Sequence, residues 1–335
     1  MKALQAHLNK WMLLYVVLAI GLGLVAGYTS AAWTQGHSSL VSTLTTVAVF
    51  FVIYPMMVNL KIESLVKAGK NVKGLSLAMI YNFIWTPLIG FALARLFLHE
   101  PLIALGFLLV MVVPCSSMAI GYTGLSGANV ELATVSVALS FVIAVFSVPF
   151  WMTVFARQYA VPVPIREMVT TIVTVLIAPM ILGYFTRRGL VHWFGEKKFQ
   201  QWQPFFPSLS LLAMFGIIFL IFFGKATMVL NKYQVVLLLL VPSALYVGLS
   251  LALQTWLNRL LGLSYQDHMA VAFTSSSSNN STAIAIATLA FSPLVAVPAA
   301  TMPIIQTLLM VTYLKLAPRV REYFAERRQA AAPTS

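Results

Sequence analysis

The stretch Thr274–Ser275–Ser276–Ser277–Ser278–Asn279–Asn280–Ser281–Thr282 stands between two apolar segments, Met269 to Phe273 and Ala283 to Phe291. A continuous polar run in the middle of such a segment is unusual. Inside a bilayer, polar groups are tolerated only where protein or a water-filled cavity satisfies their hydrogen bonds. The run therefore predicts a polar cavity, and hence a solute pathway, inside a membrane protein.

The composition supports a membrane protein independently. Hydrophobic residues make up 60% of the 335-residue chain and charged residues only 9%. Apolar stretches long enough to span a bilayer recur from end to end, which predicts an all-α integral membrane fold. The ten expected spans are roughly Trp11 to Tyr28, Leu40 to Val58, Leu75 to Leu98, Leu102 to Ile120, Ala133 to Phe155, Met168 to Phe185, Leu209 to Phe223, Val235 to Trp256, Met269 to Phe291 and Leu294 to Leu316.

Ten spans divide into two halves of five, and an odd number per half inserts the second half upside down. We therefore expect two inverted five-helix repeats, residues 1–160 and 161–320, with residues 321–335 as a cytoplasmic tail. Nine spans is the nearest alternative count. Between the spans, the two longest connections are expected at Asn59 to Gly74 and at Thr186 to Pro204, and the second is expected to lie at the membrane interface.

In folds built from inverted repeats, broken helices at corresponding places mark the binding site. The ninth span contains the Ser/Asn run, and the fourth contains Pro114 followed by small polar residues. Proline removes a backbone donor and interrupts a helix. We expect both helices to be broken and the two breaks to face each other in one site near mid-membrane. The expected substrate-binding residues are Pro114, Cys115, Ser116, Ser117, Met118, Asn82, Ser136, Ser277, Ser278, Asn279, Asn280, Ser281 and Thr282; a cation, Na⁺ foremost, is a candidate ligand of Ser275, Ser276, Asn279 and Asn280.

The distribution of Lys and Arg residues predicts how the chain is oriented in the membrane. If ten spans are assumed, sixteen of the 21 Lys and Arg residues fall on the side of the two termini, and Arg95, Arg157, Arg166, Lys225 and Lys232 fall on the other. Because Lys and Arg concentrate in cytoplasmic loops, both termini are expected in the cytoplasm of a cell whose plasma membrane the chain crosses. The charges are dispersed among loops, so anionic lipid is a better partner than nucleic acid.

The titratable residues suggest no enzyme. The chain has no Ser-His-Asp arrangement and no phosphate-cradling loop, and its one cysteine excludes a thiolate-pair metal site. Four histidines, His37, His99, His192 and His268, fall in loops or at span ends, where we expect them to be solvated. We expect no cofactor and no resident metal; the partners are membrane lipid and a small neutral or anionic solute.

Three stretches of the sequence carry further information: Pro114–Cys115–x–x–Met118, Asn82 with Pro87, and Ala272–Phe273–Thr274 through Asn279–Asn280. In that order, they resemble the fourth-span cysteine motif, the third-span motif and the ninth-span block of arsenite efflux permeases, which belong with the bile acid:sodium symporters. The resemblance implies the ten-helix fold with crossing fourth and ninth helices and, for function, extrusion of arsenite or a related small oxyanion by alternating access.

The chain departs from this family at an important position. Arsenite permeases follow the Asn-Asn pair with Phe-Glu, whereas this chain has Ser281–Thr282, and the glutamate of the bile acid symporters, a few residues earlier, is also missing. A titratable carboxylate for proton coupling is thus lost. Sodium-coupled symport of an organic anion is therefore kept as the alternative function, and a channel as the second alternative.

Cys115 has two interpretations. As(III) is thiophilic, and soft ligands select soft centres, so one thiol offers a contact weak enough to release the substrate. A buried cysteine is also commonly a small hydrophobic residue. Its place beside Pro114 in the expected break favours contact with the substrate.

Overall fold

The computed structural model describes residues 2–59, 71–159, 165–224, 226–231 and 233–330. Within these ranges the regular secondary structure is helical, apart from one isolated β-bridge. Seven helices of the described residues are long and apolar enough to cross a membrane. They are α2 (Met12–Thr29), α4 (Ser38–Val58, of which Ser39–Val58 forms the span), the continuous stretch Val72–Phe97, α9 (Val130–Gln158), α12 (Phe205–Gly224), α15 (Leu240–Leu260) and α18 (Pro293–Lys315).

The three other expected spans are each divided between two or three elements. The fourth consists of α7 (Pro101–Val112) and α8 (Met118–Leu125), and the ninth of α16 (Tyr265–Ser276), α17 (Asn280–Ile286) and the π-helical turn η4 (Ala287–Phe291). The sixth runs through α10 (Ile165–Ile172), η3 (Val173–Ile177) and α11 (Ala178–Trp202). Breaks shorten the fourth and ninth segments, so neither forms one long helix.

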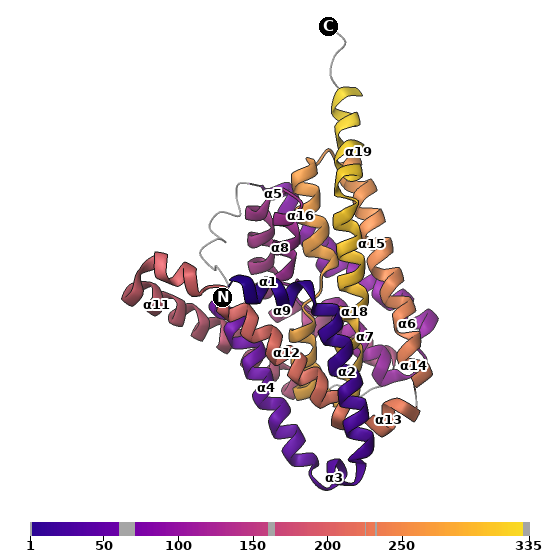
Figure 1. The fold of residues 1–335 in the computed structure, drawn as a ribbon. Helices are drawn as coiled ribbons and strands as arrows, with labels where there is room; N and C mark the ends of the chain where they lie inside the picture. The colour runs from indigo at the N-terminus through magenta and orange to yellow at the C-terminus, as the bar shows by residue number, and fades with distance from the viewer. Residues whose placement is uncertain (1, 60–70, 160–164, 225, 232, 331–335) are drawn as a thin grey trace.

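Two groups of helices make up the body of the molecule (Figure 1). In the first, here the flanking bundle, α12 packs on α2 and α4, and α11 packs on α4. The second, here the crossing bundle, contains α5 (Val72–Ile80), η2 (Tyr81–Trp85), α6 (Thr86–Phe97), α7 to α9 and α15 to α18. Each bundle takes helices from both halves of the sequence.

One helix of the crossing bundle, α7, is apolar on every side. Every residue of α7 from Ile103 to Val112 is buried, as expected for a helix that is hydrophobic on all sides and surrounded by others. The helix also approaches α18 closely at Gly106, where an added Cβ would lie 2.2 Å from the Val295 carbonyl oxygen. Glycine is needed here because the two backbones leave no room for a side chain.

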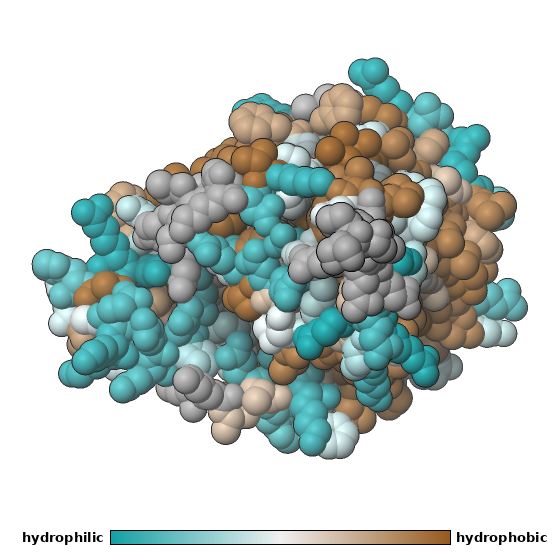
Figure 2. All heavy atoms as spheres, turned by 90° about the horizontal axis from the view of Figure 1, so that it is seen from above, coloured by the Kyte–Doolittle hydropathy of each residue, from teal (hydrophilic) through white to brown (hydrophobic). Residues whose placement is uncertain are grey.

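The smaller helices surround these bundles. They are α1 (Lys2–Lys10), α3 (Ala31–Gly36), α13 (Ala226–Asn231), α14 (Tyr233–Leu238) and α19 (Ala317–Ala330). Helix α19 extends from one end of the molecule, and α3 lies at the opposite end (Figure 1). Figure 2 looks onto the end with α19 and shows hydrophilic residues gathered over much of it, with hydrophobic residues towards one flank. This pattern fits an end in water and a flank in lipid.

The connection expected at Thr186 to Pro204 is helical. Helix α11 continues to Trp202, and Gly195 (φ 78°, ψ 155°) folds it back on itself. The fold brings Phe194 and Trp202 together, with ring centroids 5.1 Å apart, and Arg187 over the ring of Phe199 at 5.6 Å. Only glycine adopts such a positive φ at little cost. The expectation for Asn59 to Gly74 falls largely outside the described residues.

Candidate functional site

The fourth-span break is caused by Pro114. Because a proline disfavours helical backbone in the residue before it, Val113 is extended (φ −69°, ψ 159°) and α7 ends at Val112. Helix α8 begins four residues after the proline. The intervening backbone is thereby left with donors and acceptors that no helix satisfies.

The ninth-span break has no proline. Ser277 is extended (φ −115°, ψ 91°), and Asn279 caps α17 by accepting a hydrogen bond from the Thr282 amide over 3.1 Å. Serine and asparagine side chains compete with helical backbone bonds and favour caps. The polar residues therefore end one helix and begin the next.

The two breaks satisfy each other's backbone. The Ser116 amide donates to the Ser277 carbonyl over 2.7 Å, and the Asn279 amide donates to the Pro114 carbonyl over 2.9 Å. Cys115 and Ser278 form the antiparallel bridge between these two bonds. The expected meeting of the fourth and ninth segments is thus present in the structure, and it brings Pro114 to Ser116 against Ser277 to Asn279.

The candidate residues differ in exposure. Ser117 is exposed, and Ser116, Met118 and Ser281 are partly buried. The remaining expected residues are buried: Pro114, Cys115, Asn82, Ser136, Ser275, Ser276, Ser277, Ser278, Asn279, Asn280 and Thr282. The open side of the crossing is therefore formed by the start of α8, while the ninth-span residues lie inside the protein.

Cys115 points towards α9. Its thiol lies 3.0 Å from Ser140 Oγ and 3.8 Å from the carbonyl oxygen of Ser136, and the side chain is 0% exposed. The Ser140 hydroxyl also accepts from the Cys115 amide over 3.2 Å. The thiol is therefore packed between the crossing and α9 in the described conformation.

Several buried polar atoms of the site have no hydrogen-bond partner in the described part of the chain. They are Ser136 Oγ, Asn280 Oδ1 and Thr282 Oγ1. A buried polar group without a partner costs about 1–3 kcal/mol. A bound polar solute that paired with any of them would recover part of that cost.

The crossing also faces the flanking bundle. Asn279 Nδ2 lies 3.4 Å from the sulfur of Met56 on α4, and α17 packs against α4. A thioether is a weak acceptor, so this amide group has donor capacity for another ligand. The candidate site thus lies where the two bundles meet.

Sequence reasoning missed two glutamines that border the ninth-span break. Gln254 of α15 contacts Ser275 and Ser276, and Gln306 of α18 contacts Ser277, Ser278 and Asn280. Both lie in expected membrane spans, where an amide side chain is itself a sign of function or of helix association. That signal was present in the sequence and would have identified both.

The expectation that His268 is solvated is wrong. The ring is 0% exposed and stacks on Phe324 of α19, with centroids 4.6 Å apart. Asn258 Nδ2 lies 3.0 Å from His268 Nδ1, and because the amide nitrogen only donates, Nε2 carries the proton and donates to the Tyr313 hydroxyl over 2.7 Å. The C-terminal helix covers this position, which no local pattern at His268 indicates.

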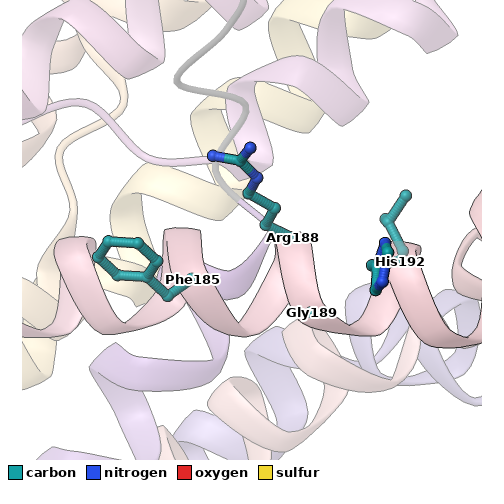
Figure 3. A pocket seen from close by; sticks show the side chains of 5 residues that line it. Phe185, Arg188, Gly189 and His192 are labelled. Atoms are coloured by element: carbon teal, nitrogen blue, oxygen red, sulfur yellow. The ribbon is translucent and has the colours of Figure 1, made fainter.

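A shallow hollow of about 480 Å³ lies elsewhere, on α11. It is lined by Phe185, Arg188, Gly189, Val191 and His192 (Figure 3). Neither helix break contributes to it. Its aromatic and basic side chains fit a helix at the lipid headgroup level rather than a transport site.

The sequence of the chain matches a known protein family. The model of the Sodium Bile acid symporter family matches residues 46–232. The chain belongs to this family. Its membership makes the protein a membrane transporter and not an enzyme. Among the residues that the structure describes, no group of three or more His, Cys, Asp or Glu side chains is placed to hold a metal ion.

Curated relatives of this family member include arsenical-resistance proteins. It is 24% identical over 301 residues to Arsenical-resistance protein Acr3 of Corynebacterium glutamicum, covering 84% of this chain and 80% of the relative. It is 22% identical over 250 residues to Acr3 of Alkaliphilus metalliredigens, covering 71% and 70%. It is 25% identical over 261 residues to the uncharacterized sodium-dependent transporter YocS of Bacillus subtilis, covering 78% of each. The resemblance inferred from the motifs is thereby confirmed.

Proposed function

We propose that this family member is a secondary active transporter of the plasma membrane that extrudes arsenite or a related small oxyanion by alternating access. The observation that carries the proposal is the crossing of two helix breaks between the bundles, with Ser116 bonded to Ser277 and Asn279 to Pro114. Such crossings expose helix ends and polar groups at one place inside the membrane. The similarity to two Acr3 proteins supports arsenite as the substrate.

The proposed architecture is ten helices in two inverted five-helix repeats, residues 1–160 and 161–320, followed by the tail 321–335, with both termini cytoplasmic. The seven long helices together with the segmented fourth, sixth and ninth segments support this count. The flanking bundle and the crossing bundle are the units that would rock against each other. The crossing would then face each side of the membrane in turn.

The chemistry of the site suits arsenious acid, which is uncharged and carries three hydroxyl groups. Hydroxyl and amide side chains both donate and accept, so Ser116, Ser277 and Asn280 are suited to a polyhydroxyl solute. Cys115 would supply the soft contact to arsenic. In the described conformation its thiol faces Ser140, so that contact requires the crossing to rearrange during transport.

Sodium-coupled symport of an organic anion is the second candidate. The family name and the similarity to YocS favour it. In this alternative, Na⁺ travels with the substrate and is held by oxygens of Ser275, Ser276, Asn279 and Asn280. A channel is a third possibility on the sequence, but separate bundles with two crossing breaks favour alternating access.

Arsenite accumulation in arsenite-sensitive cells tests the proposal. Cells carrying the chain, its Cys115→Ser variant or an empty vector are compared by elemental mass spectrometry, with and without sodium. The wild type should lower accumulation, and Cys115→Ser should remove that effect while the serine keeps its hydrogen bond to Ser140. Accumulation equal to that of empty cells would instead support the organic-anion alternative.

A further inference from the structure

Two buried amides hold the ninth-span break from either side. Gln254 of α15 is 0% exposed, and Gln306 of α18 is 5% exposed. Glutamine is costly inside a membrane unless its amide is hydrogen-bonded. The partners of both side chains lie in residues 275–280, at the break and at the helix ends on either side of it.

Gln254 contacts the last turn of α16. Its Nε2 donates to Ser276 Oγ over 3.3 Å, and its Oε1 accepts from Ser275 Oγ over 2.8 Å. Ser275 Oγ also lies 2.6 Å from the Val271 carbonyl oxygen. Ser276 Oγ therefore accepts from a neutral amide, and the one hydroxyl proton of Ser275 has two neutral acceptors within reach.

Gln306 contacts the extended residues of the break and the start of α17. Its Nε2 donates to Ser277 Oγ over 3.2 Å and to the Ser278 carbonyl over 3.3 Å, while its Oε1 accepts from Asn280 Nδ2 over 3.3 Å. On the side of η2, Asn82 Nδ2 donates to the Thr274 carbonyl over 3.4 Å. Side-chain amide N–H groups therefore point at oxygens of four residues between Thr274 and Ser278.

The oxygens that accept from the two glutamine amides do not suit a sodium ion. A hard cation is bound by the lone pairs of oxygen atoms, whereas here the positive ends of amide dipoles are directed at the oxygens of Ser276, Ser277 and Ser278. The stretch 274–282 contains no carboxylate whose negative charge would attract a cation despite these dipoles. Asp267, nearer the start of α16, accepts a hydrogen bond from Asn129 over 2.8 Å.

We propose that Gln254 and Gln306 are positioning residues that replace a coupling cation at the ninth-span break, so that this family member keeps its crossing intact and cycles without binding sodium there. The neutral amides supply the cross-links that a cation and carboxylate would otherwise provide. The inference refines the coupling of the proposed transporter and makes the sodium-symport alternative the less favourable one.

Thermal unfolding of the purified full-length protein tests this. Melting is compared in sodium chloride and choline chloride at equal ionic strength. A ligand that binds only the folded state raises the melting temperature as its concentration exceeds Kd. We expect the wild type to differ by less than about 1 °C between the two salts, because it offers sodium no site.

Gln254→Glu is the informative variant. It places a carboxylate beside Ser275 and Ser276, which should create a cation requirement and a sodium-dependent rise of roughly 3 °C or more. Gln201→Glu, on the exposed end of α11, adds the same charge at the surface and should show no such rise. A role in packing alone would change the melting temperature equally in both salts.

The wild-type titration decides the question even where Gln254→Glu fails to fold. A saturable sodium-dependent rise in the wild type that Ser276→Ala abolishes would overturn the inference. Gln306→Glu is the second variant and should acquire sodium dependence in the same way. Because this readout needs no substrate, absence of arsenite efflux would overturn the proposed substrate and leave the sodium result unaffected.

Discussion

Cys115 and Ser278 pair as an antiparallel bridge although they are 163 positions apart in the chain. The bonds on either side of this pair, Ser116 to Ser277 and Asn279 to Pro114, satisfy backbone groups that both helix breaks would otherwise leave unpaired in the membrane. Each break therefore depends on the other. A substitution in one break should therefore also disturb the backbone of the other break.

Asn280→Ala should reduce transport of any substrate by about tenfold, since loss of a buried polar contact of about 1.4 kcal/mol corresponds to that factor. The substitution removes the Oδ1 atom that has no partner within the described residues, together with the bond from Nδ2 to Gln306. Initial rates at equal surface expression are the measurement. Leu289→Ala, in the partly exposed η4, is the matched control and should transport normally. Normal rates in Asn280→Ala would remove this residue from the site.

Gly106→Ala should destabilise the crossing bundle. The added methyl group would meet the Val295 carbonyl oxygen at 2.2 Å, and overpacking of this kind costs about 1–3 kcal/mol, or roughly 5 °C in melting temperature. The comparison is with Gly216→Ala in α12, where an added Cβ meets nothing within 4 Å. The melting temperatures of both variants are measured by size-exclusion chromatography of samples heated to a series of temperatures. Equal melting of the two variants would show that α7 and α18 are not packed as closely as described.

Tyr313→Phe should lower stability by about 1–3 kcal/mol, because it leaves His268 Nε2 without its acceptor in a buried site. The same hydroxyl lies 2.7 Å from Thr255 Oγ1, so two contacts are lost. Tyr233→Phe, at an exposed position, should be neutral. A double-mutant cycle with His268→Phe would measure the coupling between the two residues, and an additive result would contradict a direct bond.

The sequence predicted the features that arise from local chemistry. Pro114 ends α7 through its missing donor and its effect on Val113, and Asn279 caps α17, so both breaks were visible in the residues themselves. Which atoms then meet across the break was not visible. The bonds from Gln254 and Gln306 join helices far apart in sequence, and no local pattern specifies such pairs.

His268 shows the same limit. It stands at the end of an expected span, where solvent exposure is the ordinary outcome for histidine. The structure buries it because α19, from the far end of the chain, places Phe324 against its ring. The burial of His268 is set by tertiary packing, whereas the polar break ten residues later is set by its own side chains.

Cysteine labelling should establish which ends of the molecule face the cytoplasm. The native Cys115 is the one cysteine of the sequence and is buried, so it should react little with a membrane-impermeant maleimide. Ser39→Cys lies beside α3, and Lys198→Cys lies on the folded-back end of α11; both positions are exposed. With cytoplasmic termini, the cysteine at 39 should be labelled in intact cells and the one at 198 only after permeabilisation. The reverse pattern would invert the proposed orientation.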